Sequence, residues 1–215
     1  MRLERVLLGR AIRLMRISGP GGGEIYGINL ARACEARYGF LQSPRTLEEF
    51  DLTKGVTFLH GYFQNRIVID RFQVFQNGML AEAKINTDEC DAFLDDAVEW
   101  VKKEGGIGAI EETGSPRFYS SNLEVQGSFS LAEKLPQLNQ IGREIADKLR
   151  EYRQTTVDYE LVGLLYAAGS GMVPAFRFER REDAPEGARL YYSAAPLRTN
   201  DHLPLLERFD AILTD

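Results

Sequence analysis

A run of small residues near the N-terminus, residues 18–23 (Ser-Gly-Pro-Gly-Gly-Gly), is the first candidate for a chemically active loop. It lies between a predicted strand and a predicted helix, where backbone N–H groups can hold a phosphate. A P-loop ends in Gly-Lys-Ser/Thr, whereas this run continues with Glu24, whose carboxylate would repel phosphate. The dinucleotide-binding pattern also fails, because its third glycine would fall at Glu24. We therefore expect a surface loop, and keep a nucleotide-binding enzyme that uses this loop with Arg13 or Arg16 as an alternative.

The chain has two histidines, His60 and His202. His60 lies in an apolar strand pattern, and His202 lies in the first turn of the last predicted helix, beside Asp201. Neither is close in sequence to a Gly-x-Ser-x-Gly nucleophile motif. A catalytic triad can still be assembled from distant residues, so a small hydrolase that uses His60 with a carboxylate is a second form of the enzyme alternative.

Acidic residues recur at helical spacing between positions 88 and 99, where they are Asp88, Asp91, Asp95 and Glu99. Such a row could hold a hard cation, but it lacks the Asp-rich loop that calcium favours and any Glu-x-x-His pair. We expect a solvated helix face, with no metal site and no cofactor. The two cysteines, Cys34 and Cys90, have neither zinc-site nor disulfide-framework spacing, so they are expected to be small buried hydrophobic residues.

Arginine and aromatic residues alternate along three predicted strands in the second half of the chain. On a sheet face, such residues can stack single-stranded nucleic acid, but they are also enriched in protein interfaces. The formal net charge of −6 favours the interface over nucleic acid, whose phosphates attract basic surfaces. The candidate interaction residues are Arg117, Tyr119, Arg177, Phe178, Arg180, Tyr191 and Tyr192.

The composition is that of a globular protein with a sizeable core. The chain has 215 residues, of which 44% are hydrophobic and 27% charged, and no apolar run approaches the ~20 residues that span a bilayer. The Arg-rich start has some features of a mitochondrial presequence, but we expect it to be the first structural element. These observations predict a cytoplasmic protein.

The first half of the chain predicts a strand, a helix, three strands and a second helix. The apolar spacing of residues 3–17 fits either a helix or a strand, and the turn-rich segment that follows favours a strand. A helix at 28–38 would be capped by Asn29 and ended by Gly39. Two β-rich runs, 56–63 and 66–75, are followed by Asn77-Gly78, which predicts a type I′ hairpin turn and a third strand ending near residue 86. Thr87 would cap a helix over 88–103, whose inward residues are Cys90, Leu94, Ala97, Val98 and Val101.

The second half repeats this order. A strand at 117–127 precedes a helix from Pro136 to Arg153, and strand-like runs follow at 157–167, 173–181 and 188–195. A last helix over 202–213 would be capped by Thr199 or Asn200. The helix that starts at Pro136 carries one long apolar seam, made of Leu138, Ile141, Ile145, Leu149 and Tyr152.

The sequence therefore predicts an α+β fold in which antiparallel three-stranded meanders have helices packed on one face. Residues 1–112 and 113–215 would form two similar halves, either by duplication or within one continuous domain. The order α-βββ-α followed by further strands is similar to the topology of type III secretion chaperones. That resemblance concerns the fold and implies no function.

None of these patterns completes an active site, which needs a nucleophile with its base, a metal cluster or a phosphate loop. The function predicted is a non-enzymatic protein-binding, assembly or adaptor protein that works in a homo- or hetero-oligomer, without membrane contact. The alternatives are the small enzyme described above and a nucleic-acid-associated protein that uses the Arg-aromatic strands.

Overall fold

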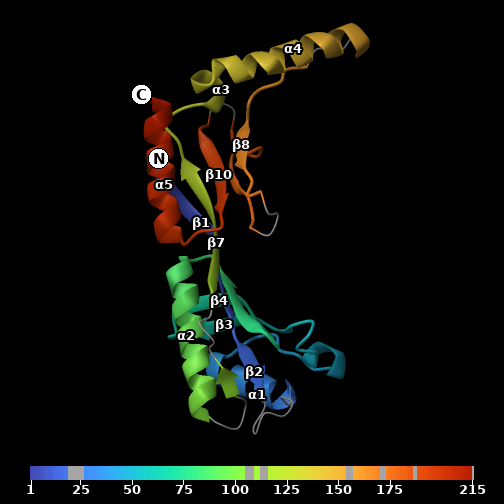
Figure 1. Cartoon of the computed structure of the whole chain (residues 1–215), viewed down its shortest axis with the longest axis vertical. Helices are drawn as coiled ribbons and strands as arrows, with labels where there is room; N and C mark the ends of the chain where they lie inside the picture. The colour runs from blue at the N-terminus through green and yellow to red at the C-terminus, as the bar shows by residue number, and fades with distance from the viewer. Residues whose placement is uncertain are drawn as a thin grey trace. The chain divides into compact units, whose positions relative to one another are not determined.

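The computed structural model describes residues 1–18, 27–104, 109–111, 116–153, 157–169, 173–185 and 188–214. In this part of the chain it contains ten β-strands and five α-helices, and eight of the strands form one antiparallel sheet (Figure 1). The predicted α+β class is confirmed. The predicted loop at 18–23 lies outside the described residues, apart from Ser18.

The chain divides into two compact units. The first, here called the α2 unit, contains Val6–Ser121 and Leu197–Thr199; the second, the α5 unit, contains Met1–Arg5, Asn122–Pro196 and Asn200–Asp215. Each unit therefore contains residues from both ends of the chain. The predicted division into 1–112 and 113–215, and its origin in a duplication, remain predictions.

The α2 unit is built on a meander of three strands. β3 (Val56–Phe63), β4 (Ile67–Phe75) and β5 (Gly78–Ala83) pair in sequence, and β5 also pairs with β1 (Arg2–Leu14), giving the order β3-β4-β5-β1. A short second sheet joins β2 (Arg16–Ser18) to β6 (Ala109–Glu111). The prediction of strand rather than helix for residues 3–17 is confirmed.

The second hairpin turn of the meander differs from the prediction. Phe75 pairs with Gly78, so Gln76 and Asn77 form the second turn, and neither Asn77 nor Gly78 has a positive φ. The predicted type I′ turn is therefore wrong. Gly78 is needed for a different reason, because a Cβ there would collide with the carbonyl oxygen of Arg13. Positive φ angles occur instead in the first turn, at Gln64 (51°) and Asn65 (56°).

Helices α1 (Gly27–Tyr38), α2 (Thr87–Glu104) and the 3₁₀ helix η2 (Leu47–Phe50) complete this unit. Gly39, with φ of +60°, ends α1 as predicted, but Asn29 lies inside the helix instead of capping it. The residue that caps α2 is Asn86, whose Oδ1 accepts a hydrogen bond from the N–H of Asp88 at 2.9 Å.

Thr87 and Thr199 form a reciprocal pair instead of capping their own helices. The hydroxyl of Thr199 accepts a hydrogen bond from the N–H of Thr87 at 3.1 Å, and the hydroxyl of Thr87 accepts one from the N–H of Thr199 at 2.8 Å. Both residues are buried, so each hydroxyl satisfies an N–H group that would otherwise be left unpaired.

Aromatic side chains fill the core of the α2 unit. Phe93 of α2 meets both Tyr38 of α1 and Phe72 of β4 edge to face, with ring centroids 4.9 and 5.1 Å apart. The five predicted inward residues of α2 are all buried, as is Cys34 of α1. The expectation that the acidic row on α2 is solvated is wrong for Asp91, whose side chain is buried in ion pairs with arginines.

The α5 unit has the strand order β8-β9-β10-β7, with β8 at Gly163–Tyr166, β9 at Phe176–Arg180 and β10 at Leu190–Ala195. Of β7 (Arg117–Gln126), it contains the part from Asn122 on, and the residues before that belong to the α2 unit. Its helices are α3 (Leu131–Lys134), α4 (Pro136–Arg153) and α5 (Thr199–Thr214). The bounds predicted for α4 are confirmed. Phe129, Phe178, Tyr191 and Leu206 are buried at the centre of this unit, where Phe209 contacts Phe129 and Phe178.

Candidate functional site

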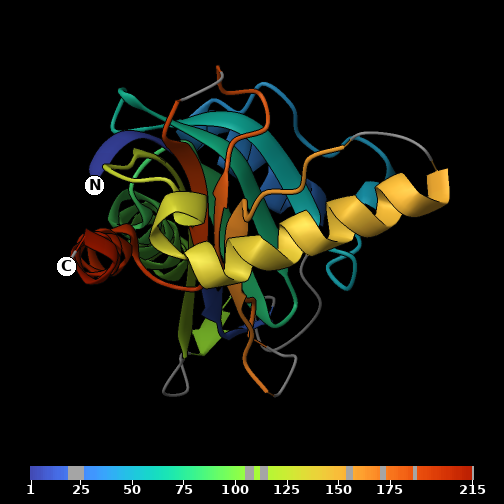
Figure 2. The ribbon, with the colours of Figure 1, turned by 90° about the horizontal axis from the view of Figure 1, so that it is seen from above.

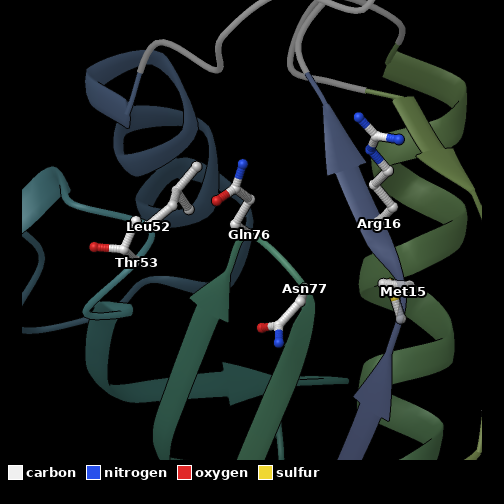
Figure 3. A pocket seen from close by; sticks show the side chains of 6 residues that line it. All are labelled: Met15, Arg16, Leu52, Thr53, Gln76 and Asn77. Carbon is white, nitrogen blue, oxygen red and sulfur yellow. The ribbon is translucent and has the colours of Figure 1, made fainter.

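Arg16, one of the two arginines named in the glycine-run alternative, lines the cavity in Figure 3, and the glycines themselves lie outside the described residues. This cavity in the α2 unit, of about 640 Å³, is lined by Met15, Arg16, Leu52, Thr53, Gln76 and Asn77. Two backbone N–H groups of its lining residues already donate to carbonyl oxygens, from Met15 to Asn77 and from Gln76 to Leu52, and the N–H of the adjacent Ile17 donates to Gln76. A phosphate cradle needs such groups to be available. Among the described residues of this lining, Arg16 is the one with a charged side chain.

A serine and a histidine lie within hydrogen-bond distance in the α5 unit. Ser193 Oγ of β10 is 2.9 Å from His202 Nε2 of α5, and it donates its proton to the carbonyl oxygen of Arg177 at 3.0 Å. A nucleophile would have to give that proton to the imidazole. Both residues are 0% exposed, and burial lowers the pKa of His202 to about 4. The pair therefore joins strand to helix as a neutral buried contact that substrate cannot reach.

His60 has a carboxylate nearby, as the enzyme alternative requires, but the contact is loose. Its Nδ1 lies 3.9 Å from Asp70 Oδ1, which is longer than a hydrogen bond, and about half of its side chain is exposed. The backbone of His60 has a φ of 55°, an unusual conformation within a strand.

Arginines from three segments converge on Asp91 in the α2 unit. Arg13 of β1 donates to Asp91 Oδ1 at 2.7 Å and Arg117 of β7 donates to Asp91 Oδ2 at 2.9 Å, while Arg198 lies 3.5 Å from the same oxygen. Tyr119 donates to Asp91 at 3.0 Å and lies beneath the Arg198 guanidinium, 4.4 Å from ring centre to Cζ.

The charges of this cluster are largely satisfied internally. Arg13 also pairs with Asp95 at 2.5 Å, and this hydrogen bond lowers the pKa of Asp95. Two of the predicted interaction residues, Arg117 and Tyr119, are thus held in a network that fixes α2 to β1 and β7. Such a network stabilises the unit and leaves little charge to attract a ligand.

The other five predicted interaction residues lie in the α5 unit, but the structure separates them. Phe178 and Tyr191 are buried and stack on each other at 4.5 Å. The remaining three, Arg177, Arg180 and Tyr192, line a cavity of about 620 Å³. The cavity is also lined by Val162, Arg181 and three acidic residues, which are Glu179, Glu182 and Asp183. Strand alternation explains why Arg177 and Tyr192 face away from Phe178 and Tyr191, because neighbouring residues face opposite sides of a sheet. Arg180 shares the face of Phe178 and reaches the cavity at the last position of β9.

An apolar stripe on α4 lies open to solvent. Four residues of the predicted seam are exposed, by 47% for Leu138, 53% for Ile141, 42% for Ile145 and 73% for Tyr152. The face of α4 that contacts its own unit is a different one. Asn139 Oδ1 accepts from the N–H of Leu161 at 2.9 Å, and a Cβ on Gly142 would collide with the backbone of Tyr159.

The contact face of α4 is narrow because its residues are small. Gly142 and Ala146 lie one helical turn apart and allow a close approach, and Ala146 is the one described residue of α4 that is buried. This small-residue spacing is the signal by which the sequence could have distinguished the inward face from the apolar seam. The seam was predicted, but its exposure was not.

The edge of the sheet in the α5 unit is also apolar. β8 pairs with β9 on one side and is the terminal strand, and its Leu165 and Tyr166 are 58% and 61% exposed. It is shorter than the predicted strand 157–167, because Tyr159 and Leu161 contact α4 instead of a strand. An open edge strand with apolar side chains is a ready site for pairing with another chain.

No family model matches the chain, and no curated protein matches its sequence significantly. No helix among the described residues has the length and apolar character needed to cross a membrane. In the same part of the chain, His, Cys, Asp and Glu side chains form no group of three that could hold a metal. Cys34 and Cys90 are free thiols, and burial raises the pKa of each to about 12.

Proposed function

We propose that this chain is a non-enzymatic protein-binding or assembly protein that acts within a homo- or hetero-oligomer, and that α4 carries its binding surface. The observation that supports this most strongly is the exposed stripe of Leu138, Ile141, Ile145 and Tyr152. Scattered apolar residues are normal on a protein surface, but a contiguous row along one helix is typical of an interaction site.

The shape of the surface suits a protein partner. A helix face presents its apolar residues at i, i+3 and i+4, which is the way an amphipathic helix is recognised by a second helix or a groove. The edge strand β8, with Leu165 and Tyr166, extends the apolar surface available in the same unit. Arg177, Arg180 and Tyr192 remain candidates for a polar rim of this surface.

The two alternatives have less support. Enzyme chemistry would need an accessible nucleophile and base, whereas Ser193 and His202 are fully buried. Nucleic-acid binding would need a basic surface, whereas the cavity that holds Arg177 also holds Glu179, Glu182 and Asp183. A cytoplasmic location remains a prediction.

Photo-crosslinking in living cells tests the proposed function. A photoreactive amino acid at Ile141 should form a covalent adduct with a polypeptide, identified by mass spectrometry, whereas the same amino acid at the neighbouring Gln140, on another face of α4, should not. The Ile141 adduct should disappear when Ile145→Glu is added. The absence of any protein adduct at Ile141, or equal adducts at both positions, would contradict the proposal.

A further inference from the structure

We propose that the partner of the α4 stripe is a second copy of this chain, and that two α4 helices pack antiparallel about a twofold axis that passes beside Ile145. This inference rests on the proposed function, because it names the occupant of the same surface. It follows from the spacing of the stripe, the charges at its border and the area that the stripe exposes.

The spacing of the apolar residues is symmetric about Ile145. The intervals along Leu138, Ile141, Ile145, Leu149 and Tyr152 are 3, 4, 4 and 3 residues, the same in both directions. A twofold interface requires a surface that is complementary to itself. In an antiparallel pair centred on Ile145, Leu138 of one copy lies opposite Tyr152 of the other, and Ile141 lies opposite Leu149. A partner of different sequence would impose no such symmetry.

The charged residues beside the stripe are also complementary to themselves. At 100° per residue, Glu144 and Lys148 border the stripe on the side away from Gly142 and Ala146, which face their own unit. The same antiparallel register brings Lys148 of each copy alongside Glu144 of the other, within about 3 Å along the axis. The two Glu144 carboxylates come equally close to each other along the axis, so each Lys148, which also binds Glu151 of its own helix at 2.9 Å, is needed to offset their repulsion.

The exposed area reaches the lower limit for a specific dimer. From the exposed fractions, the stripe presents on the order of 500 Å² to water, so complete burial of both copies would remove on the order of 1,000 Å², where specific interfaces begin. The helix is also accessible over its length. Figure 2 shows that its C-terminal half extends away from β8, β9 and β10 of the same unit.

The mass of the purified full-length chain in solution gives the first test. Light scattering coupled to size exclusion should report twice the chain mass of 24.3 kDa. Ile145→Glu should weaken self-association at least about 100-fold, because it places two like charges at the twofold axis. Gln140→Glu adds the same charge on another face of α4 and should leave the mass unchanged. A monomer at every accessible concentration would overturn the inference.

Charge-swapped variants test the register. Lys148→Glu alone and Glu144→Lys alone should each weaken self-association severalfold, because each homodimer then places like charges together. An equimolar mixture of the two variants should form a heterodimer as tight as the original pair. Mixing cannot restore affinity that a variant loses through a change within its own helix. If the mixture does not regain the affinity of the original pair, the antiparallel register is ruled out.

Cysteine crosslinking locates the twofold axis. Ile145→Cys should form a reducible dimer on mild oxidation, because the two new thiols meet at the axis, and the native thiols Cys34 and Cys90 are buried. Leu138→Cys should not, because the two positions lie about 21 Å apart along an antiparallel pair. A dimer crosslinked through Leu138→Cys would indicate a parallel arrangement and overturn the proposal.

The photo-crosslinking experiment separates the two proposals. An adduct between two copies of this chain at Ile141 supports both. An adduct with a different protein, together with a monomeric mass, leaves the proposed function standing and overturns the dimer. The absence of any protein adduct at Ile141, together with a monomeric mass, overturns both.

Discussion

The two units share an order of elements but cover their sheets differently. The α2 unit has strands in the order β3-β4-β5-β1, and the α5 unit has β8-β9-β10-β7, with one helix following the last strand of each meander. In the α2 unit the helix that precedes the meander, α1, buries Leu30, Cys34 and Tyr38. In the α5 unit the corresponding helix, α4, buries only Ala146 among its described residues.

A second similarity is a buried glutamate between two arginines in each unit. Glu82 pairs with Arg10 and Arg71 in the α2 unit, and Glu124 pairs with Arg5 and Arg181 in the α5 unit. These parallels agree with the predicted internal repeat, which remains a prediction. The corresponding helices nevertheless differ: α1 completes a core, whereas α4 leaves most of its apolar stripe exposed.

The largest expected effect concerns the charge network of the α2 unit. Asp91→Ala should lower the free energy of unfolding by about 3–5 kcal/mol, because it leaves the buried guanidinium of Arg13 without its main partner. Asp95→Ala, on the same helix but 54% exposed, should cost about 1 kcal/mol or less. Equilibrium denaturation measures both. Equal costs would mean that the network is no more important than a surface ion pair.

Truncations in the two corresponding helices sharpen the comparison directly. Leu30→Ala in α1 should cost about 2–5 kcal/mol of stability, because it leaves a cavity in the core. Ile141→Ala in α4 should cost about 0.5 kcal/mol or less when measured under dissociating conditions, because its side chain is half exposed. If Ile141→Ala in the dissociated chain costs as much as Leu30→Ala, then α4 belongs to a core and not to a binding surface.

As the pH falls from neutral, the first loss of folding stability should arise in the α5 unit. His202 is neutral when folded, with its pKa lowered to about 4, whereas the unfolded chain binds a proton near pH 6.5. The contribution of neutral His202 to the free energy of unfolding is therefore present above pH 6.5. It is lost as the pH falls from 6.5 to 4, by about 3 kcal/mol in total. His202→Leu should flatten the stability profile in that window. An unchanged slope would show that His202 is solvated.

The smallest expected effect concerns the tight turns of the α2 unit. Gln64→Gly should raise stability by about 0.5–1 kcal/mol, because Gln64 holds a positive φ that glycine adopts without steric cost. Gln76→Gly, in the next turn, should lower stability by a similar amount, because its φ is not positive and glycine adds unfolded-state entropy. Thermal denaturation of both variants checks the turn assignment, and a gain from Gln76→Gly would reverse it.

Local patterns were sufficient to predict most of the elements. β-branched and aromatic runs predicted β3, β4, β9 and β10, and a 3.6-residue apolar period predicted α2, α4 and α5. The turn type was wrong because the hairpin register depends on pairing with β1, where Gly78 lies against Arg13. The prediction of a solvated acidic face failed for a similar reason. Asp91 has the sequence spacing of an exposed helix face, but arginines from distant segments bury it.

The sequence by itself determined the α+β class, the order of the elements and the apolar seam of α4, because hydrophobic periodicity and turn residues act over short distances along the chain. Only the tertiary structure decided which of those apolar faces were covered. Whether a stripe becomes core or surface depends on what packs against it: α1 meets Phe93 and Trp100, whereas α4 approaches its own unit through Gly142 and leaves Ile141 and Ile145 in water.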